Sequence, residues 1–386
     1  MRPAIRRELR VAGDGLGEMI RVAFIIASFN VGGAERQLLT LLRRLDRNRV
    51  ELGLFVMGSG GLLQDVPSDV SVESGLSSSG ADLGAVGVLA DALRKFAPDV
   101  VIQYGRTAAG LVGRLAARRA GVPVIAQAVH SNEFSARTPK RWLHNRLNRL
   151  VDGSTDAWIC VSRSQEKRLL AAGVPADRMR LIPNGVDLHE FSPVDQAAAI
   201  ADGSGPVRVV AVGGFRPVKR YDVLVDALGQ AIGNGADLHV SFAGAGETLE
   251  AVKMRVGQLG LAENVSFLGE RDDVAALLRD SDILVSTSDS ESSSLVAVEA
   301  MGCCLPVLAT RSGGIEEIVV DGETGILVPA GDVSALGQAL VRLGAERELR
   351  RRMGLAGRAR ALSMFSVETM VSKYEDLIEE LACLSR

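Results

Sequence analysis

Two glutamates eight positions apart form the pattern in this chain that is richest in possible chemistry. They bound the stretch ESSSLVAVE, residues 291–299, in which Glu291 follows the strand-like run DILVSTS and Glu299 lies within an apolar, helix-like run. A carboxylate accepts hydrogen bonds from paired hydroxyl groups, such as the vicinal diol of a sugar. The spacing therefore predicts that Glu291 holds a hexose ring and that Glu299 holds a ribose.

The alternative is that Glu291 is an ordinary turn residue and Glu299 a surface charge. The run AMGCCLPV that follows Glu299 looks buried, however, and a carboxylate beside a buried run needs a partner. We therefore favour the binding interpretation, most of all for Glu299.

Three serines connect Glu291 to the helix-like run. Ser292, Ser293 and Ser294 suit the position that caps a helix N-terminus. The main-chain N–H groups of Ser294, Leu295 and Val296 would point at any anion placed above the start of the helix. A diphosphate is therefore expected between the two glutamates.

A basic loop, GGFRPVKRY at residues 213–221, is the second candidate anion site. It leaves a strand-like run with two glycines, Gly214 being the second, and then supplies Arg216 and Lys219. An arginine binds phosphate with two parallel hydrogen bonds, and a lysine supplies a point charge. A solvated basic turn is the alternative, but the position directly after a strand favours a diphosphate site.

Two features of the first half of the chain also follow strand-like runs. Gly32 and Gly33 come after IRVAFIIASF, where glycine permits a tight turn and a close approach of the backbone to a ligand. His130 ends the run PVIAQAVH. A tight turn without a ligand and a structural histidine are the alternatives, and the sequence leaves both open.

The elements that must position these residues alternate between strand-like apolar runs and helix-like segments. Apolar runs of this kind predict parallel strands covered on both faces. The opening strand, Gly-Gly turn and helix recur at residues 207–228, and the aperiodic segment 192–206 suits a linker. We expect two doubly wound, Rossmann-like α/β domains facing a central cleft, with ligands at the carboxyl ends of the strands.

Composition excludes several functions. The 386 residues carry a net charge of -3 and only 4% aromatic residues, which disfavours nucleic-acid binding. The four cysteines and four histidines show no metal-ligand spacing, and DSD at residues 280–282 falls at the entry end of a strand, so no metal site is expected. No apolar run reaches the roughly 18 residues that span a bilayer, and no signal peptide is evident, which predicts a cytoplasmic protein.

The segment PKRWLHNRLNRL, residues 139–150, is basic and amphipathic. Such a helix could rest on an anionic membrane, which would place the protein at the inner membrane face. A packed helix with a basic outer face is the alternative, and we slightly prefer it.

The run from Glu291 to Asp332 resembles the donor-site signature of the family 4 (group 1) retaining glycosyltransferases of GT-B fold. That signature combines E-x7-E, a run like Ala-Met-Ala-x-Gly-x-Pro-Val, and Gly-Gly-x-x-Glu. Further stretches resemble the family in the same order along the chain: VGGAERQLLTLL, QAVHSN, CVSRSQEKRLL, LIPNGVDLHEFSP, VGGFRPVKRYDVLVDAL and VSFLGERDDVAALL. This ordered set makes the resemblance specific.

The resemblance implies different roles for the two domains. Residues 20–190 would form the acceptor-side domain, residues 207–364 the domain that binds the nucleotide-diphosphate sugar, and residues 365–386 a helix that returns to the first domain. The resemblance also implies that no metal is needed, and that no cofactor is required beside the nucleotide-sugar donor, which is a substrate. The acceptor would be a saccharide or a lipid-linked sugar, as in polysaccharide or glycolipid synthesis.

The resemblance also assigns roles to residues of the donor domain. Lys219 would bind the diphosphate, and Arg216 would replace the arginine that family members often carry where Gly214 stands here. Glu291 would hold the transferred sugar and Glu299 the ribose.

The remaining roles involve the base and the other domain. The backbone near Arg271 would meet the base. From the first domain, Gly32 and Gly33 would approach the diphosphate, and His130 would contact the sugar.

The chain departs from the family after the first glutamate. A Gly-Phe-Gly-like or Ser-Phe-Gly-like run is usual there, and this chain has three serines, residues 292–294.

The predicted function is retaining transfer of a sugar to an acceptor hydroxyl. The alternatives are a nucleotide-sugar-binding protein without turnover and a sugar-nucleotide epimerase of similar fold.

Overall fold

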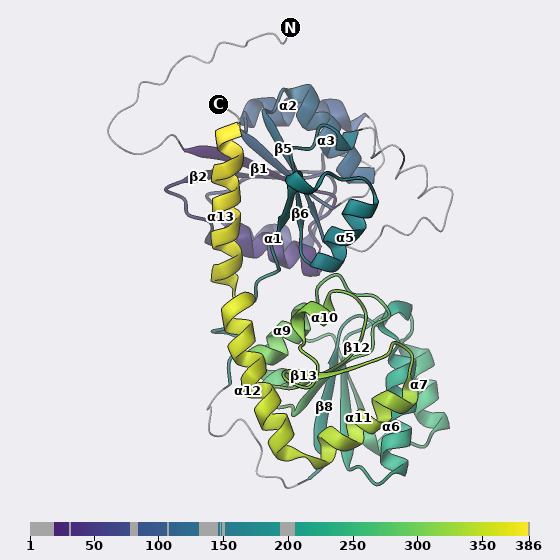
Figure 1. Ribbon diagram of the computed structural model, residues 1–386. Coiled ribbons are helices and arrows are strands. Elements are labelled where there is room, and N and C mark those ends of the chain that lie inside the picture. The colour runs from purple at the N-terminus through teal and green to yellow at the C-terminus, as the bar shows by residue number, and fades with distance from the viewer. Residues whose placement is uncertain are drawn as a thin grey trace.

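Two α/β domains lie one above the other, each built around a parallel sheet (Figure 1). The computed structural model describes residues 19–30, 32–77, 84–105, 108–130, 146, 148, 151–193 and 205–384. Both sheets have their first strand in the interior and wind outward in both directions from it. This arrangement confirms the predicted pair of doubly wound, Rossmann-like domains.

The first sheet has the strand order β3-β2-β1-β4-β5-β6-β7. Its strands are β1 (Ile20–Ile26), β2 (Val50–Val56), β3 (Ser71–Ser74), β4 (Val100–Tyr104), β5 (Val124–Val129), β6 (Ala157–Cys160) and β7 (Met179–Leu181). The helices described between them are α1 (Gly33–Arg44), α2 (Ala85–Phe96), α3 (Ala108–Ala120) and α5 (Arg163–Ala171), with short 3₁₀ turns at Gly61–Asp65 and Ala176–Arg178.

Strand β1 shows why the sequence runs are continuously apolar. Val22 and Phe24 pack on the face covered by α1, whereas Ala23 and Ile25 pack on the face covered by α2 and α3. Both faces of the strand are therefore removed from water, as expected for a parallel sheet.

The second sheet has the strand order β10-β9-β8-β11-β12-β13. Its strands are β8 (Val207–Val212), β9 (Leu238–Ala243), β10 (Val265–Gly269), β11 (Ile283–Ser286), β12 (Val307–Thr310) and β13 (Gly325–Val328). Its helices are α6 (Tyr221–Gly233), α7 (Leu249–Gln258), α8 (Val274–Arg279), α9 (Leu295–Gly302), α10 (Ile315–Ile318), α11 (Val333–Ala345) and α12 (Arg347–Met364), with 3₁₀ turns at Pro217–Lys219 and Ala262–Asn264.

The last helix, α13 (Val367–Leu384), packs against the first sheet. Buried side chains of α13, among them Tyr374 and Ile378, belong to the same core as β1 and α1. Polar contacts add to this packing, since Arg180 forms an ion pair with Glu380 and the main-chain N–H of Asp46 donates to Glu375. The helix thus ties the end of the chain to the domain in which it begins.

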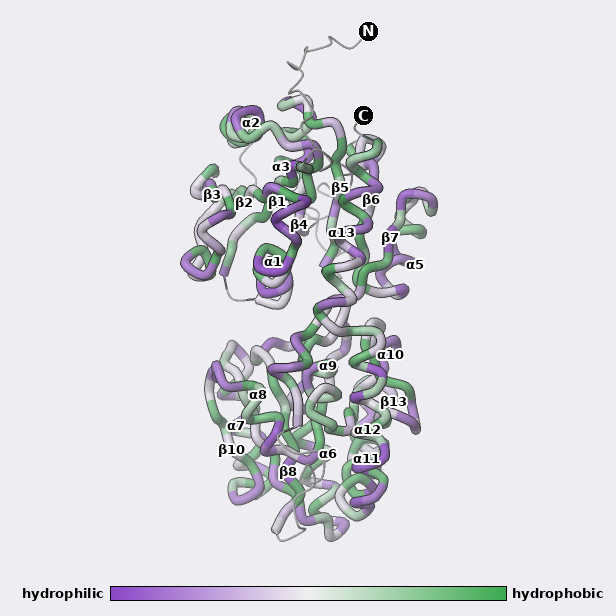
Figure 2. The backbone as a smooth tube through the Cα atoms, turned by 90° about the vertical axis from the view of Figure 1, so that its left-hand side faces the viewer, coloured by the Kyte–Doolittle hydropathy of each residue, from purple (hydrophilic) through white to green (hydrophobic). Residues whose placement is uncertain are grey.

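The chain crosses between the domains at two neighbouring places. Val186 donates its N–H to the carbonyl of Phe365 at 2.9 Å and accepts one from Val367 at 2.9 Å. In Figure 1, α12 and α13 run along one side of the molecule and connect the second domain to the first. Figure 2 shows α1 at the edge of the first domain that faces α9 in the second.

Two predictions fall largely on residues outside the described ranges. Of the basic segment 139–150 only Arg146 and Asn148 are described, and Asn148 is buried and accepts a hydrogen bond from Arg114. Most of the expected linker, residues 194–204, also lies outside them. In the part of the chain that the structure describes, no helix combines the length and the apolar character needed to span a membrane.

Candidate active site

Lys219 and Glu291 meet at the carboxyl end of the second sheet. Lys219 ends the 3₁₀ turn that follows β8, and Glu291 lies in the turn between β11 and α9. The Nζ atom of Lys219 is 2.5 Å from Oε1 of Glu291, and the side chains are only 16% and 14% exposed. The two loops singled out in the sequence therefore form one shielded, charged site.

Neighbouring groups fix both members of this pair. Ser288 donates its hydroxyl to the same Oε1 at 2.8 Å, and the hydroxyl of Thr287 donates to the carbonyl of Lys219 at 2.8 Å. The second carboxylate oxygen of Glu291, Oε2, makes no hydrogen bond to a described residue. Glu291 can therefore accept a hydrogen bond from a ligand hydroxyl while it stays paired with Lys219.

Glycine is required where β8 opens into the basic loop. Gly213 has a φ of 148°, a backbone conformation that other residues rarely adopt. At Gly214, an added Cβ would lie 3.9 Å from Nε of Arg216. The side chain of Arg216 therefore lies near the place where a side chain at position 214 would begin.

The start of α9 leaves its first N–H groups available to a ligand. Ser294 is the N-cap residue, as expected for this run, but its side chain caps no N–H of the helix. An uncapped N-terminus carries free donors and a partial positive charge. The main chain at Leu295 and Val296 is therefore suited to an anion.

The glycine turn of the first domain approaches this same helix start. A Cβ added to Gly33 would lie 3.5 Å from Cδ1 of Leu295. A Cβ added to Gly32 would lie 2.3 Å from Oε2 of Glu35, whose side chain folds back over the turn. Gly33 thus lets the backbone at the start of α1 approach α9 across the gap between the domains, whereas the space beside Gly32 is filled by Glu35 of the same helix.

Glu299 lies further along α9, half-buried and opposite α1. Burial raises the pKa of this carboxyl to about 7, while the positive charge of Arg36 in α1 lowers the pKa and Glu190 raises it. The carboxylate has no hydrogen-bond partner among the described residues. The site therefore holds an acceptor that a pair of ligand hydroxyls could satisfy.

Donor binding is expected to depend on pH through Glu299. If ribose hydroxyls donate to the carboxylate, binding favours the ionised form, so affinity should fall by up to about tenfold per pH unit below about 7 and level off above it. Calorimetric titration measures the affinity at each pH. The ligand is a nucleotide sugar because, unlike a nucleoside diphosphate, it has no terminal phosphate that itself titrates near pH 6. Glu299→Gln should bind more weakly and with little pH dependence. A wild-type profile as flat as that of the variant would contradict the assignment.

The same pKa shift affects stability. A carboxyl with a raised pKa holds its proton more tightly in the folded protein than in the unfolded chain, so the protonated form favours folding. This contribution is complete below the unfolded pKa of about 4.5 and is lost as pH rises through about 7. Glu299→Gln should therefore raise the melting temperature at pH 8 and leave it nearly unchanged at pH 4.

His130 follows β5 and is held by stacking. Its ring lies against Tyr104 with centroids 4.7 Å apart and planes at 16°. Tyr104 in turn shares a 3.3 Å hydrogen bond with Tyr374 of α13. Both ring nitrogens are buried without a partner among the described residues, and burial lowers the pKa of His130 to about 4. The imidazole is therefore neutral at pH 7, with one buried donor and one buried acceptor that no described residue satisfies.

Arg271 and the DSD stretch lie apart from this cluster. The guanidinium of Arg271 is paired with Asp273 at 2.5 Å on the exposed surface beyond β10. Asp282 accepts hydrogen bonds from the main chain and side chain of Arg208 at the amino end of the sheet. Among the described residues, no three histidine, cysteine or acidic side chains gather in a metal-binding cluster.

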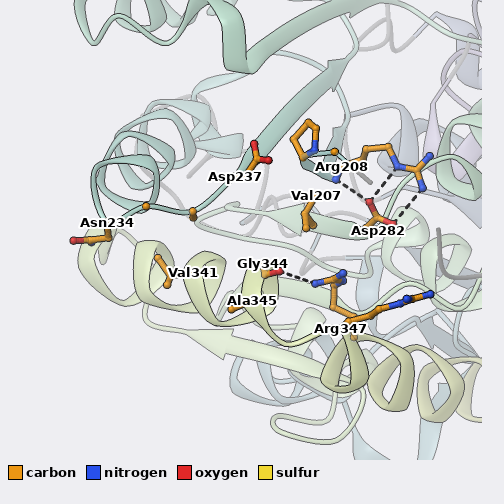
Figure 3. Close-up of a pocket in the computed structure, with 14 residues that line it drawn as sticks. Val207, Arg208, Asn234, Asp237, Asp282, Val341, Gly344, Ala345 and Arg347 are labelled. Carbon is orange, nitrogen blue, oxygen red and sulfur yellow. Dashed lines mark hydrogen bonds and ion pairs between the residues drawn. The ribbon is translucent and has the colours of Figure 1, made fainter. Parts of the chain in front are cut away.

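A pocket of about 820 Å³ opens beside Asp282 (Figure 3). It is lined by Val207, Arg208 and Asp282 at the amino ends of the strands and by Arg347 of α12. Ligands of open α/β sheets bind at the opposite, carboxyl end. We therefore place the site at Lys219 and Glu291 and not in this pocket.

Several contacts of the site have only weak signals in the sequence. The polar turn DSESSS suggests hydrogen bonding, but not that Ser288 would bond Glu291. The stack of Tyr104 on His130 joins the ends of the neighbouring strands β4 and β5, and no pattern in the sequence indicates it. Glu317, which the family signature includes, reaches the other domain and bonds the start of α5.

A cation, a carboxylate and a helix N-terminus between two Rossmann-like domains are features of enzymes that bind nucleotide diphosphates. Residues 31–190 match the model of glycosyltransferase family 4, and residues 196–360 match that of the group 1 glycosyl transferases. The chain belongs to the group 1, family 4 glycosyltransferases, and its two facing domains are the GT-B fold of that family.

Two bacterial relatives illustrate the similarity. The chain is 31% identical over 288 residues to the GDP-mannose-dependent α-(1-6)-phosphatidylinositol monomannoside mannosyltransferase of Mycolicibacterium smegmatis, covering 69% of this chain and 73% of the relative. It is 34% identical over 169 residues to the N-acetyl-α-D-glucosaminyl L-malate synthase of Bacillus anthracis, covering 44% of each. The match to that synthase thus spans less than half of its length, as does the match to the D-inositol 3-phosphate glycosyltransferase of Nocardia farcinica, at 45%.

Solved structures with the same fold include Anabaena HepE in complex with UDP. Its TM-score is 0.80 at 21% identity, with 94% of this chain and 100% of HepE covered. Sucrose-phosphate synthase from Thermosynechococcus elongatus has a TM-score of 0.76 at 20% identity, with 94% and 99% covered. At these identities the likeness establishes the fold alone.

Proposed function

We propose that this protein transfers a sugar, with retention at the anomeric carbon and without a metal, from a nucleotide-diphosphate sugar to an acceptor hydroxyl. The observation that carries the proposal is the Lys219–Glu291 pair, 2.5 Å apart, in the loops that flank β8 and α9. The fold offers a diphosphate a cation and free main-chain donors, and it offers the sugar a carboxylate oxygen.

Transfer builds negative charge on the departing diphosphate. In this proposal Lys219, Arg216 and the N–H groups at the start of α9 surround the diphosphate and stabilise that charge, which would lower the barrier without reorganisation. These groups supply the neutralisation that a divalent cation supplies in other transferases. This is why the proposal needs no metal.

The sugar would lie between Glu291 and His130. Glu291 Oε2 accepts a sugar hydroxyl, and the neutral His130 donates or accepts a second hydrogen bond. In a front-face reaction the leaving phosphate takes the proton of the acceptor hydroxyl as the new glycosidic bond forms on the same face. That route requires no nucleophile from the protein and is consistent with retention.

We also propose a saccharide or lipid-linked acceptor and a cytoplasmic location with contact at the inner membrane face. The mannosyltransferase relative acts on a phosphatidylinositol monomannoside, as its name states, which supports an acceptor presented at a membrane. Polysaccharide or glycolipid synthesis is the corresponding role.

The proposal is tested by a donor screen followed by product analysis. Nucleotide sugars that bind raise the melting temperature by mass action, so UDP- and GDP-linked sugars can be compared directly. The best donor is then incubated with candidate acceptors, and the anomeric configuration of the product is read by proton NMR. Donor binding without product from any acceptor would favour a binding protein, and conversion of the donor without acceptor would favour an epimerase.

Arg216 offers a test of the expected replacement at Gly214. We predict that Arg216→Ala lowers kcat/KM for the donor by about tenfold to a hundredfold, since it removes a charge-assisted hydrogen bond to the diphosphate. The double variant Gly214→Arg/Arg216→Ala moves the arginine to position 214, where family members often carry it. Its activity should recover in part relative to Arg216→Ala. Steady-state kinetics with the screened donor measure both. Equal activity of wild type and Arg216→Ala would remove this residue from the site.

A further inference from the structure

The two domains share the capping of one helix. Helix α5 in the first domain begins at Arg163, and its first main-chain N–H groups need acceptors. Arg163 donates its N–H to Oε2 of Glu317 at 2.7 Å, and Ser164 donates its N–H to Oε1 at 2.8 Å. Glu317 belongs to α10 of the second domain, so both its oxygens act across the gap between the domains.

The rest of the first turn of α5 is capped from within its own domain. Ser162 is the N-cap residue, and its hydroxyl accepts the N–H of Gln165. Glu317 therefore supplies the acceptors for the two N–H groups that Ser162 does not reach. Its negative charge also lies at the positive end of the helix dipole, which strengthens the contact.

The backbone at Glu317 is held by α12, the helix that leads from the second domain toward the first. Arg360 donates to the carbonyls of Ile318 at 2.8 Å and Glu317 at 2.6 Å, at the end of α10. The same guanidinium lies 5.7 Å from the ring centroid of Phe365. Phe365 is the residue whose carbonyl bonds Val186 where the chain crosses between the domains. Arg360 therefore connects the contact between Glu317 and α5 to the place where the chain crosses between the domains.

The segment before α10 connects this contact to Glu291. Gly314 donates its N–H to the carbonyl of Glu291 at 2.9 Å, and Glu291 donates its own to Ser312 at 2.8 Å. A Cβ on Gly314 would lie 2.0 Å from the carbonyl oxygen of Ser292, so only glycine permits this approach. A Cβ on the adjacent Gly313 would lie 3.1 Å from Oγ of Ser164 in α5. One short segment therefore touches both the donor-site loop and the other domain.

We propose that Glu317 is a positioning residue: by capping α5 it holds the two domains closed and links that closure to the loop that carries Glu291. It contacts neither substrate nor reacting atoms. The effect on turnover rests on the proposed function, whereas the effect on domain closure does not. Closure excludes water and brings the first domain to the sugar, so its loss slows transfer more than it weakens donor binding.

Two variants weaken the contact from opposite sides. Glu317→Ala deletes the acceptor. Arg163→Pro deletes one donor at the first position of α5, where helices favour proline, and Ser162 before it has the extended backbone (φ -154°, ψ 154°) that proline requires. Glu316→Ala is the matched control, because it removes the same charge from the neighbouring, exposed residue of α10, whose contacts with the N–H of Gly313 and with Arg311 stay within the second domain.

Small-angle X-ray scattering, with and without UDP-glucose or GDP-mannose as probes, measures closure. Glu317→Ala and Arg163→Pro should show a larger radius of gyration than wild type without a probe, Glu317→Gln an intermediate one, and Glu316→Ala the wild-type value. For the probe that turns over, kcat should fall by about tenfold or more in both variants, with its Kd changed by less than about threefold.

Folded Glu317→Ala and Arg163→Pro proteins with wild-type scattering overturn the proposal, whatever their activity. Loss of activity with unchanged scattering also overturns it, since the residue would then act in some other way. If wild type turns over neither probe, the scattering comparison still decides, so the failure of this inference and the failure of the proposed function remain distinct.

Discussion

Replacing Glu291 by alanine is expected to reduce sugar transfer by about a hundredfold to a thousandfold, the usual cost of losing a group that stabilises a transition state. The variant loses the carboxylate that contacts the sugar. It also frees Lys219, which is 2.5 Å from Glu291 in the structure, to pair with the diphosphate alone. Donor affinity should therefore stay constant or increase while kcat falls, and calorimetry together with steady-state kinetics separates the two.

The matched control for Glu291→Ala is Asp289→Ala. Asp289 lies in the same turn and has the same charge, but it is 44% exposed and pairs with Arg220 at 3.3 Å. The control should keep wild-type activity. Full turnover by Glu291→Ala, or a loss of kcat in the control of the same size, would contradict the role given to Glu291.

Lys219→Met is expected to lower kcat/KM for the donor by at least about a hundredfold. The substitution keeps the length of the side chain and removes the charge that binds the diphosphate, so both donor affinity and kcat should fall. It also leaves Glu291, only 14% exposed, beside the diphosphate without its cation. This repulsion makes the loss larger than that of one hydrogen bond.

Because the two residues touch, their effects should not add. The double variant Lys219→Met/Glu291→Ala removes both charges and should lose less activity than the sum of the two single losses, expressed as free energies. Lys253→Ala, an exposed lysine of α7 paired with Glu250, is the control for a lost positive charge. Additive losses in the double variant would show that Lys219 and Glu291 act independently.

The sequence predicts the fold well because its strands are short, apolar and separated by helical segments. The recurrence at residues 207–228 of the opening at residues 20–45 indicates two domains of one type, and the parallel order of both sheets confirms it. The rule that ligands meet the carboxyl ends of strands then selects the loops in which Lys219 and Glu291 are found.

The details of the site depend on tertiary contacts that no local pattern records. Residue types and spacing suggest that Ser294 caps α9, yet its hydroxyl does not bond the helix in the structure. A sequence also does not show that Tyr104 stacks on His130, or that Arg36 faces Glu299 across the domains. The stack joins the ends of two neighbouring strands of one sheet, and the position of Arg36 relative to Glu299 depends on how the two domains pack.

The contact of Glu317 with α5 is a second example of a tertiary contact that the sequence does not predict. The pattern Gly-Gly-x-x-Glu gives the residue a place in the family signature, but only the structure shows that its partners are the main-chain N–H groups of another domain. Main-chain donors leave no trace in residue types. Such partners can be found only once the fold is known.

A crystal structure with the nucleotide sugar that most raises the melting temperature tests the central claim most directly. The account predicts a diphosphate oxygen within hydrogen-bonding distance of Lys219 Nζ and of the main chain at Leu295, with the ribose on Glu299 and the sugar between Glu291 and His130. A nucleotide bound instead in the pocket beside Asp282, or anywhere away from Lys219 and Glu291, would contradict it.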